Sequence, residues 1–126
     1  MAEAFDVGIL GEKIARRFLR RHGYRILESN IHQSHKEIDI IATNKEYIVF
    51  VEVKTRSVEN DPSELYERAA SAVNKRKQQN LIFAARSYLS QHYTDKQPRM
   101  DVLEVYVKKG TKKVVEINHI TNAYLS

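Results

Sequence analysis

The spacing of apolar residues changes along the chain between a helical and an extended period, and these changes predict the elements. Through residues 6–22 the apolar positions lie three or four residues apart, the spacing of one helix face. This stripe consists of Val7, Leu10, Ile14 and Phe18, with Gly11 and Ala15 beside them. Gly23 follows directly and is a typical C-terminal stop. We therefore expect a helix that packs through this stripe, with Glu12 at its border.

Segments rich in β-branched and aromatic residues predict strands. They cover residues 24–31, 37–43, 47–54, 100–107 and 114–120. Only residues 44–46 separate the second strand from the third, which predicts an antiparallel hairpin.

A second helix is predicted over residues 74–89, with Asn74 as its N-cap. The residues that it is expected to bury are Leu81, Ala85, Tyr88 and Leu89. The preceding stretch, 57–71, contains the turn signal Asn-Asp-Pro-Ser and is predicted to be a loop with room for one short helix.

The predicted order is one helix, three strands, a second helix and two more strands. A strand, a helix and a further strand favour a right-handed parallel crossover. We therefore expect an α/β fold, with a mixed sheet of about five strands flanked by helices. No repeat or linker interrupts residues 1–126, so one domain is expected.

Composition then narrows the class of protein. The chain is 42% hydrophobic and 29% charged, which is typical of a globular domain. It has no cysteine, which excludes disulfides, thiolate metal sites and a cysteine nucleophile. No apolar run approaches the about 20 residues of a membrane span, and residues 1–6 lack the pattern of a signal peptide. We expect a cytoplasmic protein without membrane contact.

The formal net charge of +5 permits a polyanionic partner, and the basic residues are concentrated in three places. They are Lys13, Arg16, Arg17, Arg20, Arg21 and Arg25 near the start, Lys75, Arg76 and Lys77 at the start of the second predicted helix, and Lys108, Lys109, Lys112 and Lys113 near the end. Each group is either a phosphate-binding surface or an ordinary solvated face, and composition alone does not decide between them.

Charged residues also interrupt two neighbouring apolar strands. Glu52 and Lys54 are two residues apart and therefore point to one face of their strand. Glu37 and Asp39 interrupt the preceding strand, and a suitable hairpin register brings Asp39 near Glu52. Buried charges are usually paired or bound to a metal. The pattern thus indicates either a weak Glu52–Lys54 pair at a strand end or a cation between two carboxylates.

Carboxylate, carbonyl and water ligands suit Mg²⁺ or Mn²⁺ rather than zinc. Such an ion activates water and neutralises charge on a phosphodiester. Lys54 beside it would orient that water or stabilise the transition state. Asp101, which interrupts the fourth strand, is expected to be a structural salt-bridge or capping residue instead.

Asp39, followed by Glu52 and Lys54 on the next strand, resembles the PD-(D/E)XK nuclease superfamily, whose core has the same order of helix, three strands, helix and strand. More narrowly, the chain resembles the bacterial YraN family, which is similar to Holliday-junction resolvases. The matching segments are 11–12 (Gly-Glu), 23–24 (Gly-Tyr), 37–42 (Glu-Ile-Asp-Ile-Ile-Ala), 49–56 (Val-Phe-Val-Glu-Val-Lys-Thr-Arg), 99–102 (Arg-Met-Asp-Val) and 122–124 (Asn-Ala-Tyr).

The resemblance implies a restriction-endonuclease-like core in which Asp39, Glu52 and the Val53 carbonyl bind the metal. It implies that Lys54 is catalytic with these carboxylates, and that Glu12 from the first helix closes the site. The candidate phosphate contacts are Arg17, Arg21, Arg56, Lys75, Lys77 and Gln78.

Two positions depart from the pattern. Ile38 stands where the superfamily has proline, and Lys36 stands where YraN-like sequences usually have glycine. A lysine at position 36 would crowd the approach to the metal, so it bears on activity more than on the fold.

The expected function is that of a metal-dependent endonuclease that hydrolyses phosphodiester bonds in DNA, with branched or repair intermediates as candidate substrates. The alternative is a nucleic-acid-binding or repair-accessory module with little turnover. A weaker alternative is a basic scaffold for protein contacts, in which Glu52 and Lys54 merely pair. Resolvase-like relatives are often dimers, which leaves a homodimer open.

Overall fold

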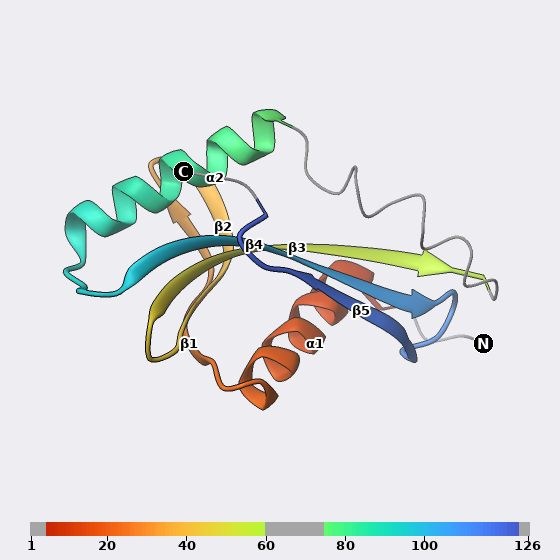
Figure 1. The fold of residues 1–126 in the computed structure, drawn as a ribbon. Coiled ribbons are helices and arrows are strands. Elements are labelled where there is room, and N and C mark those ends of the chain that lie inside the picture. The colour runs from red at the N-terminus through yellow and green to blue at the C-terminus, as the bar shows by residue number, and fades with distance from the viewer. Residues whose placement is uncertain (1–4, 60–74, 124–126) are drawn as a thin grey trace.

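The computed structural model describes residues 5–59 and 75–123, which form two helices and five strands (Figure 1). In chain order these are α1 (Val7–Arg21), β1 (Arg25–Gln33), β2 (Lys36–Thr43), β3 (Tyr47–Val58), α2 (Lys75–Gln91), β4 (Gln97–Lys108) and β5 (Val114–Ile120). The strands form one sheet in the order β1-β2-β3-β4-β5. Adjacent strands are antiparallel except β3 and β4, which are parallel, so the predicted mixed sheet and hairpin are confirmed.

The parallel pair of β3 and β4 runs in unbroken register from Tyr47↔Gln97 to Val58↔Lys108. Both strands are longer than their apolar patterns predicted. β3 continues beyond Lys54 to Val58, whereas β4 begins three residues earlier than predicted, at Gln97. The chain crosses between them through α2, as the strand–helix–strand order predicted (Figure 1). The predicted N-cap Asn74 and most of the predicted 57–71 loop lie outside the described residues.

The first helix begins and ends where local chemistry dictates. The side chain of Asp6 accepts a hydrogen bond from the backbone N–H of Ile9 at 3.1 Å, which caps the N-terminus. Gly23 follows the C-terminus with φ +90°, a conformation that favours glycine because it has no Cβ. The helix therefore has nearly its predicted bounds.

Each face of the sheet is covered by one helix (Figure 1). The α1 face buries Ile14, Ala15 and Leu19 of the helix against inward-facing residues of β2, β3 and β4. The α2 face buries Leu81, Ala84, Ala85 and Tyr88 against Ile38, Ile41, Ile48, Phe50 and Met100. Leu89, which was predicted to be buried, is only partly so. β2 and β3 are thus covered on both sides, which explains their nearly continuous apolar sequences.

A buried hydrogen-bond network joins β4 to three distant segments. Asp101 is fully buried and accepts hydrogen bonds from Arg99, from Nε2 of His119 at 2.7 Å and from the backbone N–H of Asn122 at 2.9 Å. Arg99 also donates to the hydroxyl of Tyr24 at 2.6 Å. The predicted structural role of Asp101 is confirmed.

In the part of the chain that is described, neither helix is long and apolar enough to cross a membrane.

Candidate active site

The hairpin of β2 and β3 opens at the level of Asp39. Registered pairs run from Thr43↔Ile48 to Ile40↔Val51 and then stop, so Asp39 and Glu52 occupy the next opposing position. On the other side of β2, Asn30 has φ 50° at the position facing Asp39. Such a left-handed residue in a strand marks a local irregularity. The strands therefore diverge where the candidate site begins.

The side chain of Asp39 fills the gap between these strands. Its Oδ2 accepts a hydrogen bond from the backbone N–H of Val53 at 2.8 Å, in place of the missing strand pairing. In an extended strand, the N–H and C=O of one residue point to the same side. The carbonyl of Val53 therefore faces the same gap as Asp39, as the metal-ligand prediction requires.

The carboxyl groups of Asp39 and Glu52 lie close enough to share a hydrogen bond. Burial, followed by this hydrogen bond, raises the pKa of Asp39 to about 8, and the negative charges of Glu52 and Glu12 act in the same direction. The hydrogen bond from Val53 opposes the rise. Without a cation, a proton thus relieves the repulsion between the two carboxyls.

Lys54 lies two residues beyond Glu52 on the α2 side of the sheet and is half-buried. Burial lowers its pKa, and a hydrogen bond with Lys77 of α2 lowers it further, whereas the charge of Glu52 opposes the change. The charges of Lys77 and Arg56 also lower it. In the described residues Glu52 and Lys54 form no salt bridge, so the simple ion-pair interpretation has no support.

The first helix approaches the site through Gly11, which lies against Thr55 of β3. A Cβ at Gly11 would stand 1.8 Å from Oγ1 of Thr55, so only glycine permits this approach. The next residue, Glu12, is half-buried and raises the pKa of Asp39 through its charge. The predicted closing residue therefore lies at the site, where it acts electrostatically on Asp39.

An open groove of about 340 Å³ leads to Glu52 from the α2 side. Its lining consists of His35, Lys36, Glu37, Glu52, Lys77, Asn80 and Leu81. Lys36, which stands where YraN-like sequences usually have glycine, lines this groove. Asn80 was not predicted from the sequence, although it lies three residues after Lys77, on the same helix face.

The predicted phosphate contacts divide between two surfaces. Arg56 and Lys77 lie near Lys54, and Lys75 and Gln78 belong to the same first turns of α2. Arg17 and Arg21 instead project from α1, which covers the opposite face of the sheet. The structure therefore does not bring these two arginines to the groove at Glu52.

The oxygen atoms at the hairpin opening fit a hard divalent cation. Among residues 5–59 and 75–123, no group of three or more His, Asp or Glu side chains is placed to hold a metal. The oxygen atoms available at the opening are therefore those of two carboxyls and one main-chain carbonyl. Such all-oxygen sets suit Mg²⁺ or Mn²⁺, which keep several water ligands.

The five-stranded mixed sheet with a helix on each face is an α/β fold consistent with a restriction-endonuclease-like core. Comparison with known proteins adds the family. Residues 11–105 match the model of the uncharacterised protein family UPF0102, which is the YraN family. The chain therefore belongs to the UPF0102 family, and the resemblance to YraN is confirmed.

Relatives in this family match over nearly their whole length. A UPF0102 protein of Caldanaerobacter subterraneus is 42% identical over 119 residues, covering 94% of this chain and 93% of the relative. One from Acetivibrio thermocellus is 45% identical over 121 residues, covering 93% and 89%. Another, from Chlorobium phaeobacteroides, is 40% identical over 124 residues, covering 94% and 92%.

Proposed function

We propose that this protein is a metal-dependent endonuclease that hydrolyses phosphodiester bonds in DNA. The observation that carries the proposal is the contact between the carboxyls of Asp39 and Glu52 in an opened hairpin, with Lys54 on the same face of β3 as Glu52. Like-charged groups are costly to hold together in a buried place unless a cation joins them. If Asp39 and Glu52 only held the two strands together, an uncharged hydrogen-bonding pair would do so equally well.

Asp39, Glu52 and the Val53 carbonyl would hold Mg²⁺ or Mn²⁺. The bound ion would supply an activated water and neutralise charge on the phosphodiester. Glu12 would add negative charge at the same point and strengthen the attraction for a cation.

Three basic side chains beside Glu52 would accept a proton from the attacking water and stabilise negative charge on the phosphate. They are Lys54, Lys77 and Arg56. Burial and the contact with Lys77 lower the pKa of Lys54, which makes its amine a better proton acceptor and hydrogen-bond partner for a water. Lys77 and Arg56 supply positive charge beside it, where a phosphate oxygen would be stabilised. The groove that reaches Glu52 is open, so it leaves room for a polymer strand.

The test is cleavage of labelled single-stranded, linear duplex and branched DNAs with Mg²⁺ or Mn²⁺. Lys54→Met should reduce cleavage by about 10²–10⁴-fold, the usual contribution of a positioned proton-transfer group. Asp39→Asn should abolish it. Glu46→Gln, at the exposed turn of the same hairpin, is the matched control and should cleave like the parent.

Cleavage that survives Asp39→Asn would mean that the activity arises elsewhere. If the parent binds DNA but none of the substrates is cut, the alternative of a repair-accessory module is correct.

A further inference from the structure

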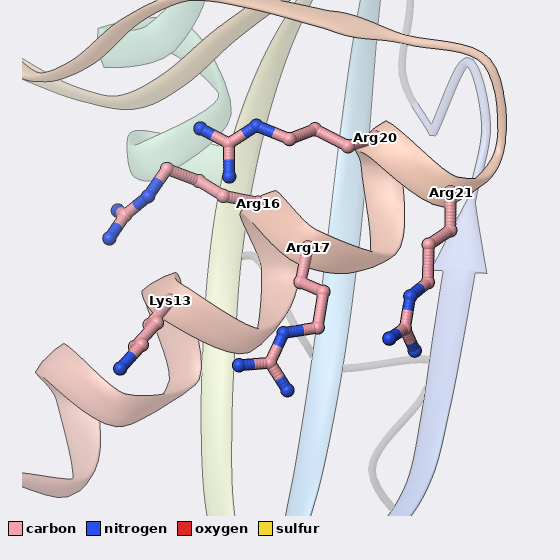
Figure 2. Close-up of a pocket in the computed structure, with 5 residues that line it drawn as sticks. All are labelled: Lys13, Arg16, Arg17, Arg20 and Arg21. Carbon is pink, nitrogen blue, oxygen red and sulfur yellow. The ribbon is translucent and has the colours of Figure 1, made fainter.

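The outer face of α1 carries a row of basic side chains that lies away from the candidate active site. Five basic side chains line an open groove of about 550 Å³ there: Lys13, Arg16, Arg17, Arg20 and Arg21. Arg16 and Arg20 extend along one flank of the helix, and Lys13, Arg17 and Arg21 along the other (Figure 2). No carboxylate lies among these lining residues, and none of the five forms a salt bridge within residues 5–59 and 75–123.

Their arrangement follows from helix geometry. Residues four apart lie above one another on a helix, about 6 Å apart along its axis at 1.5 Å per residue. The two rows, 13-17-21 and 16-20, are therefore parallel lines of charge on a straight support. The opposite side of α1 is buried, with Ala15 and Leu19 fully covered by the sheet, so the helix cannot turn to spread these charges.

We propose that this groove is a docking surface for the phosphate backbone of a nucleic-acid duplex, separate from the candidate active site. The two surfaces lie on opposite faces of the sheet, because α1 covers one face and the groove at Glu52 opens beside α2 on the other. The docking surface therefore acts without the metal and does not depend on the proposed hydrolysis.

Three features favour a duplex backbone over other polyanions. Four of the five cations are arginines, whose planar guanidinium groups bind phosphate oxygens in pairs. The lining has no aromatic side chain, so it lacks the stacking platform that single strands use. Membrane-surface helices insert an apolar face, whereas the apolar face of α1 is buried against the sheet.

The experiment measures binding of a short labelled duplex in EDTA as a function of salt concentration. Each neutralised phosphate contributes about −0.9 to the slope of log K against log salt. Arg17→Gln/Arg21→Gln should make the slope less steep by about 1.8, and Arg16→Gln/Arg20→Gln should do the same if both rows hold the backbone. Glutamine keeps the side-chain length and helix preference, and circular dichroism would verify that each variant folds.

The matched control is Arg76→Gln/Arg86→Gln, which removes the same charge from exposed positions on α2. Its slope should stay near that of the parent. Equal flattening by the control would show that only net charge matters and would overturn the proposal, as would an unchanged slope for Arg17→Gln/Arg21→Gln. Loss of binding to anionic phospholipid vesicles, with duplex binding intact, would assign the groove to membranes instead.

A final variant separates this proposal from the proposed hydrolysis. Asp39→Asn/Glu52→Gln should keep the parent's slope in EDTA even if it loses all cleavage. A slope that flattened in this variant would show that the duplex binds at the hairpin opening rather than on α1, and would contradict the proposal.

Discussion

Gly11 of α1 and Thr55 of β3 are in contact so close that any side chain at position 11 would overlap the threonine hydroxyl. This contact brings the helix onto β3 one residue beyond Lys54 and next to Glu12. Gly11 therefore determines both how closely α1 packs on β3 and how near the charge of Glu12 lies to Asp39.

Gly11→Ala should destabilise the protein and weaken its response to Mg²⁺. The added methyl group overlaps Thr55 and forces α1 away from β3. An overlap this severe belongs at the upper end of the about 1–3 kcal/mol that overpacking costs, which exceeds the gain of about 1 kcal/mol in helix propensity. Urea unfolding measures the change. Gly8→Ala, in the same helix, is the control: its Cβ would meet only the side-chain oxygen of Asp6, at 3.2 Å, so it should lose less stability than Gly11→Ala. Equal stability of Gly11→Ala and the parent would contradict the close approach.

Glu52→Gln should leave the metal-free protein at least as stable as the parent, because it removes one of two adjacent carboxylates. Millimolar Mg²⁺ should stabilise the parent by RT ln(1 + [Mg²⁺]/Kd) and the variant much less. Urea unfolding in EDTA and in Mg²⁺ gives both quantities. If the variant instead lost about 3–5 kcal/mol under both conditions, Glu52 would be a structural ion-pair partner.

Asp39→Asn should remove a pH dependence of stability. Because the folded-state pKa is raised to about 8 from an ordinary 3.8, the folded protein retains a proton that the unfolded chain releases between these values. The stabilisation is therefore complete below the lower value and is lost as pH rises through the upper one. Asparagine cannot ionise, yet it can still accept from Val53 and donate to Glu52.

In EDTA, the stability advantage of Asp39→Asn over the parent should therefore grow as the pH rises from 3.8 to about 8 and level off above that value. Urea unfolding over a pH series measures it, with Glu46→Gln as the exposed control. A parallel pH dependence for Asp39→Asn and the parent would show that Asp39 is ionised throughout.

Asp101→Asn should be among the most destabilising single substitutions outside the site. It leaves Arg99 half-buried without its counter-charge, which costs about 3–5 kcal/mol for a buried pair. Glu116→Gln, exposed on β5, should change little and serves as the control.

The fall in the free energy of unfolding at acidic pH (the acid limb of the stability curve) gives a second test of the role of Asp101. Burial by itself would raise the pKa of Asp101, but hydrogen bonds from His119, Arg99 and the Asn122 backbone outweigh it and hold this pKa below its ordinary value. The stabilisation is thus present above the ordinary pKa and is lost as pH falls through the folded-state value. Asp101→Asn should flatten this acid limb, whereas an unchanged limb would assign the acid sensitivity to other carboxyls.

Local patterns in the sequence determined the elements and their order. The predicted strand 114–120 coincides with β5, and α1 and the 44–46 turn fall where apolar period and turn chemistry indicated. The side chain of Asn44 accepts from the backbone of Glu46 and Tyr47, which is the local hydrogen bonding that makes asparagine a turn residue. Interactions of this range are encoded within a few residues, so they can be read without the fold.

The sequence also indicated that Asp39, Glu52 and Lys54 belong together, because a short hairpin and a period of two leave few other arrangements. Only the tertiary structure decided that the hairpin opens at Asp39, that Lys77 reaches Lys54 from α2, and that Gly11 lies against Thr55. It also decided that Arg17 and Arg21 lie on the opposite face from the groove at Glu52. These relations join residues far apart in the chain, and they depend on how two helices pack on the two faces of one sheet.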